Sequence, residues 1–243
     1  MTALPLDTVV RQIGELQAPL PTATSILIGV AALGAVTLSA AWVMLRHVST
    51  ITHEGAHAVM GSGMGGRITS VTMKRNGSGL TKVLSSGGRG SSIAVAAIGY
   101  LGPSLFGLGA AKLISVGHAV AVLWLALLAL AILLPVLRNS FGVVSVVLTG
   151  GVLYLVARYT VIGTQIAVAY GIAWFLLLSG VRDVLELRRL LEYRPDENDA
   201  ATLKGLTFMP RGFWSSAWLM ATLAAVVVGG SLLTLPPATA DVC

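Results

Sequence analysis

Apolar residues fill long stretches of this sequence, and charged residues gather between them. Six stretches are long enough, or nearly so, to cross about 30 Å of hydrocarbon as helices that rise about 1.5 Å per residue. They cover residues 26–45, 92–111, 119–137, 142–157, 159–181 and 214–235. Because residues 46–60 contain no proline, we expect the first helix to continue to residue 60. The pattern predicts an all-α membrane protein with about six transmembrane helices in a single polytopic domain, residues 26–235.

One segment after the first helix departs from this pattern. Residues 67–83 alternate loosely between apolar and polar side chains around Asn76-Gly77, a dipeptide typical of tight hairpin turns. We therefore expect a small cytoplasmic β-hairpin here. An extended peptide can add as a further strand to the open edge of such a hairpin. The alternative is a plain amphiphilic connector.

Three segments lie outside the predicted spans. Residues 1–25 are expected to be extracytoplasmic, residues 182–212 to form a cytoplasmic loop, and residues 236–243 to form a tail. Residues 1–25 have no basic region before an apolar core, so we expect the first span to act as an uncleaved signal anchor.

The composition supports the membrane assignment and gives an orientation. The chain is 55% hydrophobic and only 11% charged, whereas about a quarter of the residues of a soluble domain are charged. With the N-terminus outside, twelve of the 16 Lys and Arg residues lie in loops on one side of the bilayer and three on the other, with Arg46 on the first helix. This bias predicts a multi-pass protein of the plasma (inner) membrane with both termini outside. No basic stretch interleaved with aromatic residues indicates a nucleic-acid partner.

The acidic residues single out one position. Glu54 is the only Asp or Glu between residues 16 and 182. A charged side chain at the centre of a bilayer costs about 3 kcal/mol, so such a residue indicates function. Glu54 belongs to an H-E-x-x-H motif, His53-Glu54-Gly55-Ala56-His57. On a helix, histidines four residues apart share one face and can hold a zinc ion, with the glutamate beside it as general base. The motif predicts a zinc hydrolase with its site toward the cytoplasmic side.

Four features together resemble one known family. They are residues 53–59, the Gly65-Gly66-Arg67-Ile68 entry to the hairpin, Gly77-Ser78-Gly79, and the run Gly99-Tyr100-Leu101-Gly102-Pro103-Ser104. These features resemble the site-2 protease superfamily, in particular its bacterial branch of single-domain, peptidase-like membrane proteins. The resemblance runs from about residue 41 to 109 and resumes at residues 179–210.

The resemblance implies zinc-dependent cleavage of a transmembrane segment or a membrane-adjacent peptide. His53 and His57 would be zinc ligands, and Glu54 would activate water and pass its proton to the leaving amine. The expected function is that of a zinc metalloendopeptidase acting on membrane protein substrates within the lipid bilayer. The alternative is a catalytically silent site-2-protease-like protein that acts as a binding or regulatory partner. A small transporter is a third possibility, but the sequence shows no internal repeat.

The third zinc ligand is where the sequence departs from the better-known members, which use an aspartate in an Asn-Pro-Asp-Gly or Leu-Asp-Gly setting. Neither motif occurs here, yet catalytic zinc takes three protein ligands. We favour Asp183, because it follows the fifth predicted span on the same cytoplasmic side as the motif. The other candidates are Glu186, the acidic residues from Glu192 to Asp199 with Asp199 foremost among them, and His47 or His118.

Overall fold

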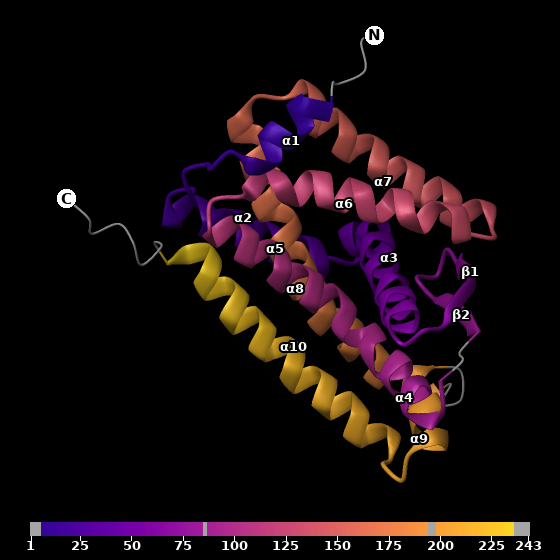
Figure 1. Cartoon of the computed structure of the whole chain (residues 1–243). Helices are drawn as coiled ribbons and strands as arrows, with labels where there is room; N and C mark the ends of the chain where they lie inside the picture. Colours follow the sequence, from indigo (N-terminus) through magenta and orange to yellow (C-terminus); the bar gives the residue numbers. More distant parts are fainter. Residues whose placement is uncertain (1–5, 85–86, 194–197, 236–243) are drawn as a thin grey trace.

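The computed structural model describes residues 6–84, 87–193 and 198–235. Its helices, labelled in Figure 1, are α1 (Leu6–Gly14), α2 (Thr22–Thr37), α3 (Ser39–Gly63), α4 (Arg89–Ile98), α5 (Gly102–Ser115), α6 (Ala119–Leu133), α7 (Ser140–Tyr159), α8 (Ile162–Tyr193), α9 (Asp199–Leu206) and α10 (Arg211–Thr234). Two short 3₁₀ helices, η1 (Gly99–Leu101) and η2 (Leu134–Val136), join neighbouring helices, and two strands, β1 (Arg67–Met73) and β2 (Gly79–Leu84), form a hairpin.

Five helical segments of the described chain are long and apolar enough to cross a membrane. They are Arg89–Ser115, Ala119–Val136, Ser140–Tyr159, Ile162–Tyr193 and Arg211–Thr234. The α2–α3 pair is a sixth if it is counted as one bent span. The expected all-α membrane protein with about six transmembrane helices and a small hairpin is confirmed.

The first predicted helix is broken rather than continuous. The axes of α2 and α3 differ by 98°, and the break lies at Leu38, whose backbone is extended. No proline or glycine occupies this position, so the local sequence did not indicate a break. The bend arises from tertiary packing: α2 lies along α8, where Gly29 meets the ring of Trp174, while α3 turns toward the middle of the molecule (Figure 1).

The segment expected as a cytoplasmic loop, residues 182–212, is mostly helical where the structure describes it. α8 continues to Tyr193, twelve residues beyond the predicted end of the span, and α9 follows after residues outside the described part of the chain. The extension is stabilised because Val184 and Leu187 on α8 are buried against α9 and its neighbours. The predicted tail, residues 236–243, lies outside the described residues.

The main core lies among the long helices. α5, α8 and α10 pack against one another, and α6 and α7 lie side by side across the bundle (Figure 1). Leu123, Ala169 and Leu177 are fully buried in this core. A Cβ at Gly107 of α5 would lie 2.8 Å from the backbone nitrogen of Leu177, so the glycine permits the close approach of α5 and α8.

The hairpin forms as the sequence predicts. β1 and β2 are antiparallel, and the turn between them contains Gly77 with φ of +83°, a conformation that glycine adopts without strain. The outer edge of β1 is already paired: Arg138 donates its backbone N–H to the Val71 carbonyl (3.0 Å), and the Asn139 side chain bonds both backbone groups of Met73. An incoming strand would therefore find its open edge at β2.

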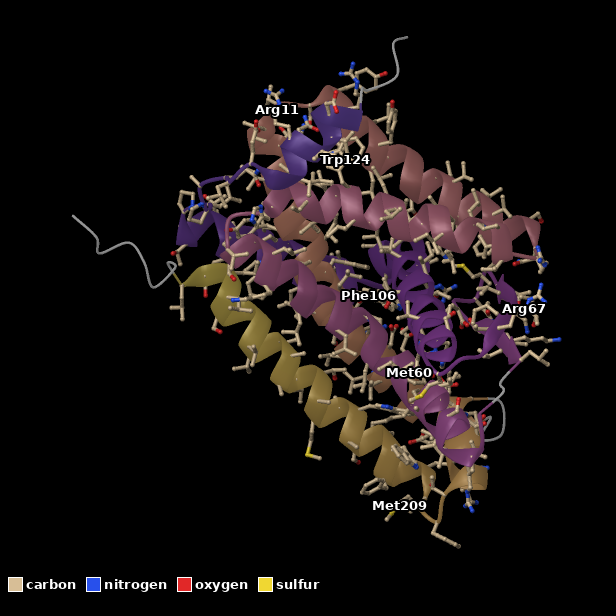
Figure 2. The ribbon with its side chains drawn as sticks, in the orientation of Figure 1. Arg11, Met60, Arg67, Phe106, Trp124 and Met209 are labelled. Atoms are coloured by element: carbon tan, nitrogen blue, oxygen red, sulfur yellow. The ribbon has the colours of Figure 1, made fainter. Side chains whose placement is uncertain are left out.

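The hairpin contacts α3 at successive positions along the helix. Near its turn, Thr50 donates to the Gly77 carbonyl at 2.9 Å, and farther along β2 Thr81 donates to the Glu54 side chain at 2.5 Å. At the end of the helix, Gly61 lies against Val83. Figure 2 shows Met60 near this end of α3 and Arg67 on the hairpin beside it.

A second, smaller core holds α9 in place. It joins α4, the end of α8, α9 and the start of α10 through the buried residues Ala96, Val184, Leu187, Ala200, Leu203 and Trp218. Trp218 also donates its indole N–H to the Ala97 carbonyl at 2.8 Å, and Arg89 donates to the Leu206 carbonyl at 2.6 Å. This cluster fixes the first residue of α9 relative to α3.

Candidate metal centre

The two histidines of the motif lie one turn apart on α3 and face the same way. Their ring centroids are 4.9 Å apart, and the rings meet edge to face at 76°. The Nε2 atoms of His53 and His57 are 3.2 Å apart. The motif therefore has the convergent arrangement that its spacing indicated.

Asp199 completes a group with these histidines. Its Oδ2 lies 3.2 Å from His53 Nε2 and 3.3 Å from His57 Nε2. Asp199 is the first residue of α9, and Asn198 caps the helix by accepting a hydrogen bond from the Ala201 N–H at 3.0 Å. Within the described ranges, this is the group of histidine and acidic residues whose ligand atoms lie close enough together to share a metal ion.

The dimensions of this group fit zinc. Bonds of about 2.0–2.1 Å from a tetrahedral zinc ion place two ligand atoms about 3.3 Å apart. The three distances of 3.2, 3.2 and 3.3 Å match one triangular face of such a tetrahedron. Two imidazoles and one carboxylate are also a ligand set that catalytic zinc sites use, with the fourth position left for water or substrate.

A hydrogen bond to a backbone carbonyl fixes the orientation of the His57 ring. Its Nδ1 lies 2.7 Å from the Val95 carbonyl oxygen, which can only accept a hydrogen bond, so Nδ1 carries a proton. In the neutral ring, Nε2 then presents its lone pair toward His53 and Asp199. A backbone carbonyl that orients a metal-binding histidine in this way is common around metal sites.

The Asp199 carboxyl is held in its charged form. Burial by itself would raise the pKa of this carboxyl, but when His53 and His57 are protonated, their hydrogen bonds to the carboxylate and the attraction of their positive charges hold the pKa below its ordinary value. The side chain keeps 21% of its exposure. A charged, partly open carboxylate is a suitable metal ligand.

Glu54 lies beside the group in a buried setting. The residue is only 2% exposed, and its carboxylate accepts the hydrogen bond from Thr81 Oγ1 of β2. A Cβ at Gly79 would overlap the Glu54 side chain, so β2 can pass this close only because residue 79 has no side chain. The hairpin thus holds the carboxylate of Glu54 in position.

Asp183, which the sequence favoured as third ligand, does not join the two histidines. Its carboxylate instead accepts a hydrogen bond from Ser49, whose hydroxyl lies 3.2 Å from that of Ser179. Ser49 precedes His53 by four residues on the same face of α3, so Asp183 meets the motif helix about one turn before the histidines. The structure brings Asp199, the alternative, to the histidines in its place.

The remaining candidates have other partners. Glu186 forms an ion pair with Arg182 at 3.0 Å, one turn apart on α8. The ring of His47 packs edge-on against Phe141, with centroids 5.0 Å apart. His118 lies in the connection between α5 and α6. None of them belongs to the group of His53, His57 and Asp199.

A cavity of about 650 Å³ opens onto the group. Its walls include the metal-binding candidates, Glu54 and Asp183, the hairpin residues 76–81, and Tyr100 of η1. The imidazole of His53 keeps 17% of its side-chain exposure, so the group is reachable from the cavity. The cavity is large enough for a stretch of extended peptide beside β2.

Three neighbours of the site were not identified from the sequence. Tyr100 belongs to the Gly99–Ser104 run that the sequence singled out, but nothing in that run indicated that its ring packs on His53. Thr81 and Val95 carried no signal, because a strand threonine and a backbone carbonyl gain their roles only from the fold.

Comparison with known proteins gave one finding. The family model described as Peptidase M50B-like matches residues 26–229, which is most of the chain. The searches of curated proteins and of solved structures gave no match.

Proposed function

The chain belongs to the Peptidase M50B-like family, a site-2 protease family of zinc metallopeptidases, and on this premise we propose that it is a zinc-dependent intramembrane endopeptidase. It hydrolyses peptide bonds in or next to transmembrane segments of membrane protein substrates. His53, His57 and Asp199 hold the zinc ion, and Glu54 is the catalytic base.

One observation carries this proposal. The ligand atoms of two histidines and of an aspartate 142 residues after the second histidine lie within 3.3 Å of one another, beside a buried glutamate in the same cavity. Asp199 is the third ligand in this proposal because its oxygen faces both Nε2 atoms, whereas the Asp183 carboxylate is bound by Ser49.

The chemistry follows from these residues. Zinc bound at such a site supplies Lewis acidity that polarises a carbonyl and makes a water molecule acidic. Glu54 takes a proton from that water and later delivers it to the leaving amine. Thr81 donates to one carboxylate oxygen of Glu54 and so fixes the orientation of the carboxylate. Val95 keeps His57 in the tautomer that binds a cation.

The hairpin supports an extended substrate. A helical transmembrane segment hides its scissile carbonyls in hydrogen bonds, so cleavage requires local unwinding. An unwound segment that pairs with the open edge of β2 would satisfy its backbone groups and pass along the cavity wall formed by residues 76–81. Because Arg138 and Asn139 already bond the outer edge of β1, the edge of β2 is the one available for pairing.

The alternative, a catalytically silent membrane protein with the same scaffold, is not favoured. An incomplete ligand set would support it, but Asp199 supplies a third ligand atom and Glu54 is present. The protein is a multi-pass membrane protein, and the bias of Lys and Arg supports a plasma-membrane location with both termini outside and the site toward the cytoplasm.

The test compares Glu54→Gln with the parent protein. Both are purified in detergent, assayed for zinc, and reconstituted in liposomes with fluorescent single-span transmembrane peptides. We expect about one zinc per chain in both proteins, cleavage by the parent, and a loss of at least about 10³-fold in the variant, because the general base is removed while the ligands remain. The matched control is Glu15→Gln, which changes an exposed glutamate that does not line the cavity.

Two outcomes would contradict the proposal. One is cleavage by Glu54→Gln at the parental rate, which would remove the general-base role. The other is zinc-loaded parent protein that cleaves none of the peptides, which would favour the silent scaffold.

A further inference from the structure

Tyr100 packs directly on the candidate metal centre. Its ring stands edge-on to the His53 imidazole, with centroids 4.8 Å apart and planes at 89°. On its other side it lies 4.8 Å from the Trp218 ring at an angle of 34°. The tyrosine is thus held between a metal-binding candidate and a buried tryptophan.

The backbone next to Tyr100 allows η1 to approach the two histidines closely. A Cβ at Gly99 would overlap the imidazole of His57 and lie 2.7 Å from His53 Nε2, so η1 reaches the histidines only because residue 99 is glycine. Trp218 is fixed in turn by its hydrogen bond to the Ala97 carbonyl. The position of the Tyr100 ring is therefore determined from two sides, as an active-site group requires.

Tyr100 lines the cavity, and its hydroxyl has unused hydrogen-bonding capacity. Glu54 and Asp199 line the same cavity. Within the described part of the chain the hydroxyl has no hydrogen-bond partner. It is also not one of the fully buried side-chain atoms without a partner, so the oxygen is accessible. It is therefore open to whatever occupies the cavity.

Several other hydroxyls in the cavity wall already donate within the protein. Thr50 donates to Gly77, Thr81 to Glu54, and Thr202 to the Asn198 carbonyl. Peptide hydrolysis builds negative charge on the carbonyl oxygen, and a fixed donor aimed at that oxygen is one of the strongest contributions a protein makes to the rate. The tyrosine O–H is a neutral donor of the required kind.

We propose that Tyr100 is a further catalytic residue, whose hydroxyl donates a hydrogen bond to the scissile carbonyl oxygen as negative charge develops on it. The inference rests on the proposed endopeptidase function. No proton leaves the phenol in this step: the hydrogen bond strengthens as the oxygen becomes negative and weakens again when the carbon–nitrogen bond breaks.

The first test is Tyr100→Phe, which keeps the ring between His53 and Trp218 and removes only the oxygen. With the liposome assay we expect kcat to fall by about 100-fold, with KM and zinc content unchanged, because the donor acts mainly in the transition state. The matched control is Tyr154→Phe, a partly exposed tyrosine of α7 away from the cavity, which should match the parent. A parental kcat in Tyr100→Phe overturns the inference, and so does loss of zinc, which would make Tyr100 a structural support of the metal centre.

The second test does not depend on turnover. A phosphinic peptide analogue carries its negative oxygen where the hydrolysed carbonyl would, whereas 1,10-phenanthroline engages only the metal. We expect Tyr100→Phe to bind the phosphinic analogue at least about 10-fold more weakly than the parent does, while zinc removal by phenanthroline is unchanged. Equal affinity for the analogue overturns the inference.

The two proposals fail in distinguishable ways. A zinc-loaded parent that cleaves no peptide rejects the endopeptidase function, and the catalytic role of Tyr100 with it. A parent that cleaves, together with Tyr100→Phe that matches it in rate and in phosphinate binding, rejects the role of Tyr100 alone.

Discussion

At the residue scale, the geometry of the candidate site depends on which atom of each side chain is free to face the others. Nδ1 of His57 donates a hydrogen bond to the Val95 carbonyl, so Nε2 is the nitrogen that faces His53 and Asp199. The Asp183 carboxylate accepts a hydrogen bond from Ser49 and does not join the two histidines. The Asp199 carboxylate, by contrast, lies beside both imidazoles. Two aspartates that look alike in the sequence thus differ in the partners that the fold gives them.

The ligand assignment predicts a difference between Asp199→Asn and Asp183→Asn. An amide cannot supply the negative charge that zinc prefers, so Asp199→Asn should lower zinc affinity by about 100-fold or more. Asp183→Asn preserves the shape and a hydrogen-bond partner for Ser49 and should keep about one zinc per chain. Competitive titration with a zinc-binding dye measures both. The reverse order of affinities would establish Asp183 as the ligand.

At the scale of elements, glycines decide how closely the helices and strands around the site approach. β2 passes Glu54 at Gly79, η1 reaches the histidines at Gly99, and α5 meets α8 at Gly107. By contrast, a Cβ at Gly109 of α5 would meet nothing within 4 Å. Glycines that are equivalent in the sequence pattern therefore have different structural importance.

This contrast predicts opposite results for Gly99→Ala and Gly109→Ala. The methyl group at residue 99 would push η1 away from His53 and His57, so we expect loss of zinc binding and destabilisation of about 1–3 kcal/mol. At residue 109 the same change should be neutral or stabilising by at most about 1 kcal/mol, because alanine favours helix over glycine. Zinc content and thermal unfolding in detergent check both variants. Full zinc binding by Gly99→Ala would show that η1 does not constrain the histidines.

At the scale of the whole molecule, the site joins two parts of the fold. α3 and the hairpin bring His53, His57 and Glu54, and the second core brings Asp199 through the packing of α9 against α4, α8 and α10. Figure 2 shows Met209 at the outer end of this region, beyond α9. The position of the third ligand relative to the histidines is thus set by a small cluster of apolar side chains.

A change in that cluster should therefore affect zinc binding without touching a ligand. Leu203 is fully buried in it, and Leu203→Ala should cost about 2–5 kcal/mol locally and weaken zinc binding while the long helices stay folded. Circular dichroism and zinc titration measure the two effects separately.

The control for this change is Phe208→Ala. Phe208 is 98% exposed and contacts Arg89 by a cation–π interaction worth at most about 1 kcal/mol, so zinc affinity should hardly change. Equal zinc affinities for Leu203→Ala and the parent would mean that α9 is held by other contacts.

The sequence by itself determined the membrane-spanning helices, the hairpin with its Asn76-Gly77 turn, and the pairing of His53 and His57 on one helical face. These features depend on hydrophobic length and on local periodicity, which are properties of contiguous residues. The tertiary structure decided the bend at Leu38, the extension of α8 to Tyr193, the partner of each aspartate and the place of Tyr100. Each of these depends on contacts between residues far apart in the chain, and no local pattern specifies such contacts.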